Sequence, residues 1–252
     1  MINKPQIFNI FPTTIYVGQV EGHYNFKNEF LKLYDKFDYV ENNISNTVSE
    51  GQVNPLIHLE PSMDLMFREI VKHIKSYVVD TLKFKDMFNY SITKTWISRT
   101  RDKKEIPWHI HSTSHVSFVY YLNIPPNSHT TRFLNIENYN SLFLGSNSHN
   151  NNDDKNMISE FNALNCKTFF IHPQEGHVAI FPSRVSHGTQ CIKEDFNDER
   201  LSIVGDCNLI LKDEHLLHSM GLIDEKYWKK FDPLEKGQTG SYNSTKGQKG
   251  QR

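Results

Sequence analysis

Trp108-His109-Ile110-His111 leads, a few residues further on, into Phe118-Val119-Tyr120-Tyr121-Leu122, a run of aromatic and aliphatic residues. A run of this kind is typical of a buried β-strand. Another apolar run ends at Phe181-Pro182, shortly before His187, and a third begins at Arg200. Buried strands with histidines and an arginine beside them predict a β-fold that brings polar side chains together at one site.

Short β-rich runs separated by polar turns fill much of the rest of the chain. They cover residues 92–98, 116–124, 168–172, 177–181 and 201–211. Upstream, apolar residues recur at helical spacing in 25–37 and again in 61–82, where Pro61-Ser62 suits a capped helix start. Residues 7–20 suit an edge strand interrupted by Pro12. We expect a mainly β fold, a barrel or sandwich, with two N-terminal α-helices packed outside it.

The composition narrows the class of protein. With 252 residues, 37% of them hydrophobic, the chain can bury an ordinary core in one domain. A formal net charge of -1 provides no general attraction to nucleic acid or an anionic membrane. Cys166, Cys191 and Cys207 form no CxxC pair, which argues against a disulfide framework or a cysteine zinc site. Since no signal or membrane segment is apparent, we expect a soluble cytoplasmic protein.

We expect a single domain over residues 1–231, with its β core at about 91–211. Within it, Gly145 to Lys155 contains no apolar residue and predicts an exposed, mobile loop. Residues 232–252 are rich in Gly, Gln, Lys and Ser and predict a disordered tail. The exposed N-terminal edge strand and helices leave a homodimer open.

His109, His111 and His187 are candidate metal ligands. In a strand, His109 and His111 project to the same face, so both imidazoles can reach one ion. Imidazole suits iron, zinc, copper and nickel alike. With 13 histidines in the chain, chance supplies about 0.7 such pairs, so the pair alone is weak evidence. The alternative is that these residues are ordinary polar groups at strand ends or in a loop.

Arg200 is a candidate carboxylate-binding residue. Its planar guanidinium can hold a carboxylate through two hydrogen bonds, and inside a barrel it needs an anionic partner. Ser202 shares its face of the strand and could donate to the same carboxylate. The alternative is a surface arginine paired with Asp198 or Glu199. Trp108 is close enough to the histidines to line the mouth of a site.

Taken together, these segments resemble a family of 2-oxoglutarate/Fe(II) oxygenases found in marine bacteria and their phages, within the prolyl-hydroxylase-like superfamily. The resemblance extends over roughly residues 7–211 and is carried by the order of its motifs. The matching segments are Ile7-Phe8-Asn9-Ile10-Phe11-Pro12-Thr13-Thr14-Ile15-Tyr16, Thr95-Trp96-Ile97, His109-Ile110-His111, Ser117-Phe118-Val119-Tyr120-Tyr121-Leu122, Pro173-Gln174-Glu175-Gly176-His177-Val178-Ala179-Ile180-Phe181-Pro182 and Arg200-Leu201-Ser202-Ile203.

This resemblance implies a double-stranded β-helix, a cupin-like jelly roll that binds Fe(II) and the co-substrate 2-oxoglutarate. It implies that Arg200, Ser202 and Tyr121 contact the co-substrate, with Tyr120 pointing the opposite way. The wider superfamily usually has His-x-Asp/Glu where this chain has His109-Ile110-His111. His111 is then a third ligand, which we favour, or it leaves the iron with two protein ligands, or it contacts the metal through water. A halogenase is disfavoured because His111 would fill the space that halide needs.

The implied reaction is hydroxylation of an unidentified small molecule or protein by O2, with release of succinate and CO2. No catalytic residue beyond the metal centre is needed, because the cofactor performs the difficult chemistry. Two alternatives remain open: a three-histidine cupin-type dioxygenase that does not use 2-oxoglutarate, and a non-enzymatic jelly-roll binding or structural module. The resemblance places the protein in the cytoplasm of a bacterium or a phage-infected host cell.

Overall fold

The computed structural model describes residues 11–37, 39–40, 48–49, 56–101, 104–136, 140, 158–192 and 198–212. All of them belong to one compact unit, residues 1–212. The second unit, residues 213–252, lies outside the described residues, as does the loop expected from Gly145 to Lys155. The extent of the domain to residue 231 therefore stays a prediction.

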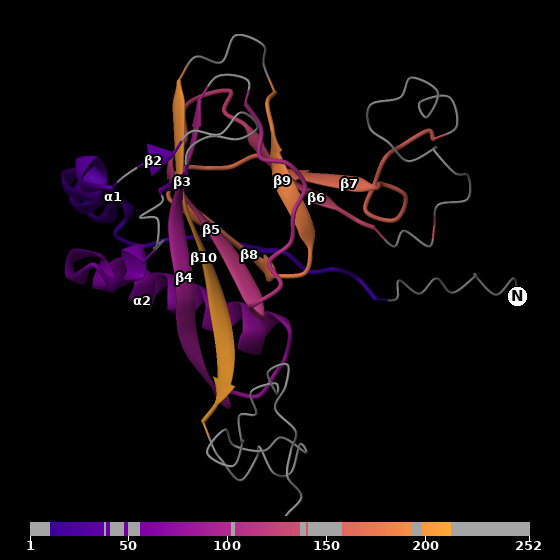
Figure 1. Ribbon diagram of the computed structural model, residues 1–252. Coiled ribbons are helices and arrows are strands. Elements are labelled where there is room, and N and C mark those ends of the chain that lie inside the picture. Colours follow the sequence, from indigo (N-terminus) through magenta and orange to yellow (C-terminus); the bar gives the residue numbers. More distant parts are fainter. Residues whose placement is uncertain are drawn as a thin grey trace, which may run out of the picture. The chain divides into compact units, whose positions relative to one another are not determined.

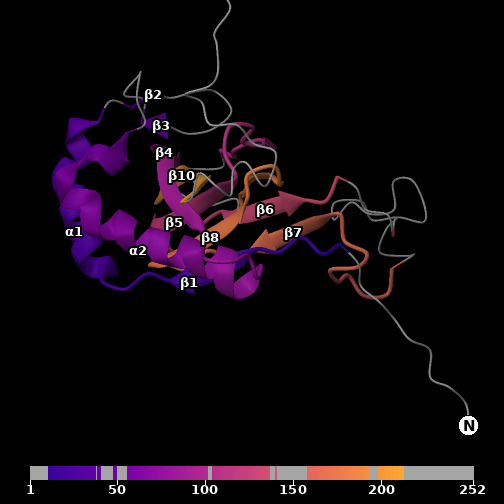
Figure 2. The ribbon, with the colours of Figure 1, turned by 90° about the horizontal axis from the view of Figure 1, so that it is seen from below.

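Two antiparallel sheets and two α-helices make up the described unit. The larger sheet has the strand order β1 (Tyr16–Gln19), β8 (His177–Pro182), β5 (Val116–Asn123), β10 (Glu199–Leu211), β4 (Phe88–Arg101), β3 (Val48–Ser49) and β2 (Tyr39–Val40). The smaller sheet has the order β7 (Thr168–Ile171), β6 (Thr130–Leu134) and β9 (Ser186–Gln190). Figures 1 and 2 show the helices on one face of the larger sheet and the smaller sheet on its other face. This arrangement confirms the mainly β fold with two helices and is consistent with a double-stranded β-helix.

Both predicted helices are present. The first is α1 (His23–Leu33), which continues into a 3-10 turn at Tyr34–Lys36. The second is α2 (Asp64–Lys75), preceded by 3-10 turns at Ile57–Leu59 and Pro61–Met63 and followed by a π-helical turn at Ser76–Thr81. The expected cap at Ser62 is wrong: the α-helix begins after Met63, and no side chain caps its first turn. In the part of the chain that the structure describes, no helix is long and apolar enough to cross a bilayer.

Alternation along β5 divides its side chains between two cores. Phe118 and Tyr120 pack against the helices, in a core that includes Phe30 of α1. Val119 and Tyr121 lie in a second core between the two sheets. Because successive side chains of a strand point to opposite faces, a strand covered on both sides needs apolar residues at every position. This explains the continuous apolar run from residue 118 to 122.

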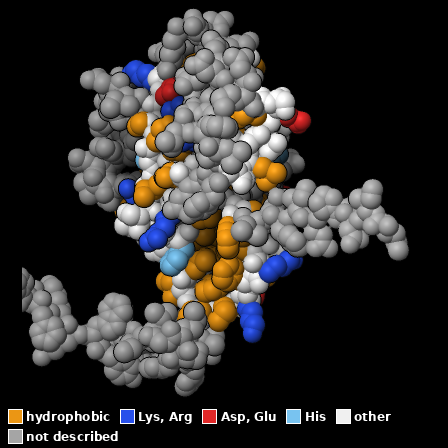
Figure 3. Space-filling view, turned by 90° about the vertical axis from the view of Figure 1, so that its right-hand side faces the viewer, with side chains coloured by type: hydrophobic (Ala, Val, Ile, Leu, Met, Phe, Trp, Pro, Cys, Tyr) orange, Lys and Arg blue, Asp and Glu red, His pale blue; other side chains and the backbone are white. Residues whose placement is uncertain are grey.

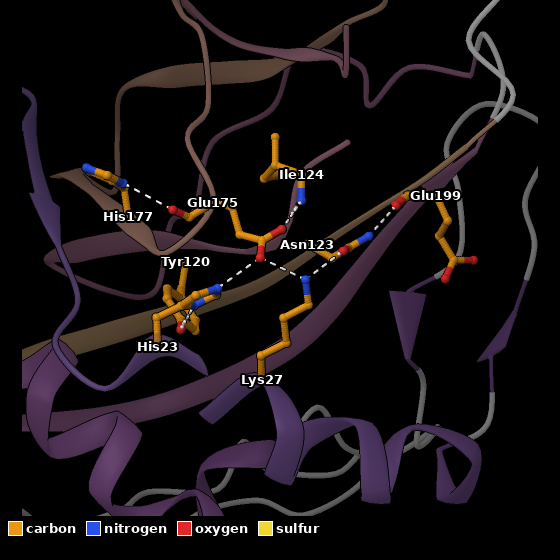
Figure 4. A network of polar contacts seen from close by, with 8 residues as sticks. All are labelled: His23, Lys27, Tyr120, Asn123, Ile124, Glu175, His177 and Glu199. Atoms are coloured by element: carbon orange, nitrogen blue, oxygen red, sulfur yellow. Dashed lines mark hydrogen bonds and ion pairs between the residues drawn. The ribbon is translucent and has the colours of Figure 1, made fainter. Parts of the chain in front are cut away.

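A polar network joins α1 to the end of β5 and to the turn before β8 (Figure 4). One carboxylate oxygen of Glu175 accepts from Lys27 at 2.8 Å and lies 3.1 Å from His23 Nε2. The other oxygen accepts the backbone N–H of Ile124 at 3.1 Å. His23 Nδ1 is 2.6 Å from the Tyr120 hydroxyl, so Tyr120 points toward the helices as expected. The network fixes the helical layer against the strand that leads into the barrel.

The strands β6 and β9 were not among the predicted strands. Their sequences, Thr-Thr-Arg-Phe-Leu and Ser-His-Gly-Thr-Gln, are short and polar, so they lack the apolar pattern on which strand prediction depends. They pair with each other in antiparallel register, Phe133 opposite His187. His187 therefore lies within a strand of the smaller sheet and not in a loop.

Gly205 of β10 marks a close approach between neighbouring strands. A Cβ atom at this position would lie 2.4 Å from Cζ of Phe118 and 2.9 Å from Cγ2 of Thr95. We predict that Gly205→Ala lowers the free energy of unfolding by about 1–3 kcal/mol, the usual cost of overpacking a core. Urea denaturation of the metal-free protein measures it. The same substitution in a Phe118→Leu background should cost less, and an equal cost in both backgrounds would contradict the steric explanation.

Candidate metal and co-substrate site

The structure brings His109, His111 and His187 together. One ring nitrogen from each lies within 4.8 Å of the other two. The backbones of His109 and His187 exchange two hydrogen bonds of 3.0 Å, and the backbone N–H of His111 donates to the carbonyl of Ser183 at 2.9 Å. His109 and His111 therefore sit on an extended segment held against the smaller sheet, not in a regular strand. Their separation by two residues still places both rings on one face.

Hydrogen bonds select which nitrogen of each ring can bind a metal. The Nδ1 of His109 is 2.9 Å from the carbonyl oxygen of Pro107, and the Nδ1 of His187 is 2.8 Å from that of Val185. A carbonyl oxygen can only accept a hydrogen bond, so both Nδ1 atoms carry the proton. The third Nδ1, in His111, faces a carboxylate oxygen of Asp206 at 2.6 Å. In all three rings Nε2 is therefore the nitrogen that these contacts leave for a metal.

The surroundings keep two of these rings neutral. Burial, followed by the neighbouring His109, lowers the pKa of His187 to about 3. Burial also lowers the pKa of His109. A metal binds the neutral imidazole, so deprotonated rings are in the form that a divalent ion requires. The donor set and its protonation therefore fit Fe(II).

Aromatic side chains surround the histidines. The ring of Trp96 lies 5.3 Å from that of His111, and the rings of Phe181 and Phe133 lie 4.7 and 6.3 Å from that of His187. Such walls exclude water and strengthen electrostatic interactions inside the site.

Trp108, expected near the mouth, is 37% exposed, and its ring lies 4.4 Å from Cζ of Arg132.

Arg200 is buried in the barrel, with 1% of its surface exposed. Its Nη2 donates to Oγ1 of Thr131 at 3.2 Å, and its Cζ lies 5.6 Å from the centre of the Tyr121 ring. Burial lowers its pKa from the ordinary value. Among the described residues it forms no ion pair with a carboxylate; the acid beside it in sequence, Glu199, pairs with arginines of β4. The alternative of a surface arginine is therefore wrong.

Unpartnered hydroxyl groups line the same inner face near Arg200. Ser202 lies opposite both Ser98 and Tyr121 in the sheet, and Arg200 lies opposite Thr100. The hydroxyl oxygens of Ser98, Thr100 and Ser202 are buried without a hydrogen-bond partner in the described structure. Buried polar groups normally have a partner, so this region is suited to a polar ligand. The ring of Tyr121 also faces this interior, where its hydroxyl donates to Thr131 at 2.9 Å.

His129, which the sequence analysis did not single out, is a buried residue close to the guanidinium of Arg200. Burial and then the positive charge of Arg200 lower its pKa to about 4. A neutral imidazole is therefore present beside the guanidinium at neutral pH.

Asp206 is a site residue that sequence reasoning missed. It lies on β10 and is 3% exposed. Burial raises the pKa of the Asp206 carboxyl group, but the hydrogen bond with His111 and the charge of that residue bring this pKa below its ordinary value. A signal existed in the sequence: Asp206 follows Arg200, Ser202 and Val204 at spacing two, so it belongs to the inward face of the strand.

Comparison with known proteins places this site in a family. A family model described as "Putative 2OG-Fe(II) oxygenase" matches residues 94–206, which include all three histidines and Arg200. This part of the chain is similar to 2-oxoglutarate/Fe(II) oxygenases. The protein is thus an oxygenase whose cofactor and co-substrate are Fe(II) and 2-oxoglutarate. None of the curated protein sequences compared with the chain matches it.

Several solved structures align with most of this chain at low sequence identity. AviO1 from Streptomyces viridochromogenes Tue57 aligns over 78% of this chain and 90% of its own, with 14% identity and a TM-score of 0.50. SnoN, a non-heme alpha ketoglutarate dependent epimerase from nogalamycin biosynthesis, aligns over 77% of each chain, with 12% identity and a TM-score of 0.50. A prolyl-4-hydroxylase from Pseudomonas putida aligns over 78% of this chain and 92% of its own, with 12% identity and a TM-score of 0.48.

Gly188 lets the segment before His109 lie directly on β9. A Cβ atom on Gly188 would lie 2.6 Å from the carbonyl oxygen of Ile106 and 3.1 Å from that of Pro107, the acceptor of His109 Nδ1. We predict that Gly188→Ala weakens divalent metal binding by about tenfold or more, since overpacking costs about 1–3 kcal/mol and 1.4 kcal/mol corresponds to tenfold. Competition with a chromophoric chelator measures the affinity.

A matched control for this substitution is Gly176→Ala, at a glycine with a φ of 80° where any side chain is strained. It should lower stability while leaving metal affinity unchanged. Equal losses of metal affinity in both variants would contradict the proposed role of Gly188.

Proposed function

We propose that this oxygenase hydroxylates its substrate at an Fe(II) held by His109, His111 and His187, with 2-oxoglutarate anchored by Arg200, Ser202 and Tyr121. The main support for the proposal is Arg200, a buried arginine that has no carboxylate partner among the described residues and lies on the inner face of the barrel that holds the three histidines. A guanidinium in this setting favours a carboxylate ligand.

The spacing of residues along β6 would allow one small ligand to reach both the guanidinium of Arg200 and the three histidines. Thr131 contacts the guanidinium of Arg200, and Phe133, two residues further on the same face, lies against His187. Two residues of a strand span about 7 Å. This is close to the length of a five-carbon dicarboxylate, so the co-substrate could reach from the arginine to the metal.

The chemistry supplied by the bound iron and co-substrate is the use of O2 to convert a substrate C–H into C–OH, while 2-oxoglutarate becomes succinate and CO2. The chain's own residues bind, orient and shield. The carbonyl groups of Pro107 and Val185 orient the rings of His109 and His187 through Nδ1, so that Nε2 of each would hold the metal. Arg200 would neutralise the distal carboxylate of the co-substrate, and the aromatic side chains around the histidines would shield the site.

The geometry favours His111 as a direct ligand over the two alternatives. Its ring offers a nitrogen within the same 4.8 Å group as those of His109 and His187. Since its Nδ1 faces Asp206, the Nε2 is the atom available to the metal. A cupin-type dioxygenase without 2-oxoglutarate would have no use for the unpaired Arg200, which therefore also separates the main proposal from that alternative.

The substrate class that we propose is a small molecule or a protein side chain. On the face shown in Figure 3, basic side chains are scattered, and hydrophobic side chains form a strip beside a histidine. A net charge of -1 gives the chain no general attraction to nucleic acid. A cytoplasmic location in a bacterium or phage-infected cell, and a homodimer, remain part of the proposal.

The first test is turnover. Purified protein loaded anaerobically with Fe(II) should convert 2-oxoglutarate into succinate when O2 is admitted, at a slow rate even without substrate. Succinate detected by mass spectrometry should require iron, O2 and the co-substrate together, and a His187→Ala variant should abolish it. Protein that binds neither Fe(II) nor 2-oxoglutarate would rule out the oxygenase reaction.

The second test separates the two binding functions. Arg200→Met should weaken 2-oxoglutarate binding by about 10–100-fold, because charge-assisted hydrogen bonds contribute about 1.5–3 kcal/mol. Metal affinity should stay within about twofold, because Arg200 is not one of the three proposed metal ligands. Calorimetric titration of the Ni(II)-loaded protein measures both.

The control is Arg101→Met, which removes an exposed arginine of the neighbouring strand that pairs with Glu199. It should change neither affinity. Parallel loss of metal and co-substrate binding in Arg200→Met would indicate disrupted folding and would remove the evidence for this anchor.

A further inference from the structure

Asp206 is an unusual residue to find beside the histidines. It is the sole acidic side chain among the buried residues of the described part of the chain. Burying a carboxylate costs several kcal/mol unless a positive charge and hydrogen bonds compensate it. Its partner is His111, whose Nδ1 lies 2.6 Å from its Oδ1. By contrast, the Nδ1 atoms of His109 and His187 face neutral carbonyl groups.

A chain of hydroxyl groups points at the same carboxylate. Ser117, directly opposite Asp206 in the sheet, is 2.8 Å from its Oδ1. Ser117 is also 2.8 Å from the hydroxyl of Ser183, which is 2.8 Å from that of Ser114. A carboxylate can only accept, so the hydroxyl of Ser117, which also lies 3.0 Å from Nδ1 of His111, donates to Asp206. Such a series of donors stabilises a charged acceptor and fixes its position.

We propose that Asp206 is a positioning residue that orients His111 and supplies the negative charge that balances the metal ion. This inference rests on the metal site of the proposed function. Three neutral imidazoles would leave both charges of a divalent ion uncompensated in an apolar site, which is costly. Asp206 reduces that charge by one through the His111 ring, without occupying a coordination position.

Asp206→Asn tests the role of the charge, because the side chain keeps its shape and an oxygen that can accept from His111. Metal affinity should fall by about 10–100-fold, the usual effect of losing an outer partner of a ligand histidine. In the metal-loaded variant, the more positive site should hold the 2-oxoglutarate dianion as tightly as the wild type or more tightly. The reduction potential of bound iron should rise, because the negative charge stabilises Fe(III) more than Fe(II).

The measurements are chelator competition with Ni(II), calorimetric binding of 2-oxoglutarate to the Ni(II)-loaded protein, and redox titration of the iron-loaded protein. The matched control is Asp86→Asn, at an exposed carboxylate that pairs with Lys75 and Lys212. It should change none of the three. If the substitution only disrupted folding, the binding of metal and of 2-oxoglutarate would weaken together. The reduction potential of iron in the molecules that remain folded would then be unchanged. That pattern, or a metal affinity within twofold of the wild type, would overturn the inference.

The wild-type protein offers a second test if Asp206→Asn does not fold. In the zinc-loaded protein labelled with ¹⁵N-histidine, the His111 ring should show a protonated Nδ1 and a metal-bound Nε2. An unprotonated or metal-bound Nδ1 would overturn the role of Asp206. Different results would contradict the proposed function itself. The wild-type protein would then bind no divalent metal, or Arg200→Met would leave 2-oxoglutarate binding unchanged.

Discussion

The pair of backbone hydrogen bonds between His109 and His187 is the interaction on which the site depends. It joins a segment that precedes β5 to β9, far along the chain, and aligns the two residues directly opposite each other. The backbone sets this register, and the centroids of the two rings lie 4.3 Å apart. The absence of a side chain at Gly188 permits the approach, so the geometry of the metal site is a property of sheet packing.

The strand β10 joins this site to the co-substrate region through one inward-facing row. Arg200 lies toward one end of the row and Asp206 toward the other, and both are buried. The charge of Asp206 is compensated by His111 and by the hydroxyl of Ser117. Arg200 has only neutral polar contacts, such as Thr131, and no carboxylate partner in the described structure. A buried charge that lacks such a partner raises the free energy of the fold, and an anion that binds there recovers part of this cost. Stability and ligand binding are therefore coupled in this barrel.

The helices and the central strands could be predicted from the sequence because their apolar residues follow a regular period. The run through Phe118 and the strand from Arg200 are covered on both sides, and α2 has an apolar stripe that packs on the sheet. The candidate ligands His109, His111 and His187 could also be proposed, since their order along the chain resembled a known family. Whether their rings meet could not be predicted, because it depends on the pairing of segments far apart in sequence.

The parts that could not be predicted have a common physical cause. The strands β6 and β9 appeared too polar to be strands, and Asp206 was hidden in a run treated as apolar. In a barrel whose interior contains a site, inward positions bind ligands as well as filling the core, so their polarity reflects the site and not exposure to solvent. Thr131, His187 and Asp206 all violate the apolar pattern for this reason. Polar residues at spacing two within strands of a small barrel are therefore evidence for where its site lies, and the same residues weaken every prediction of strands that relies on hydrophobicity.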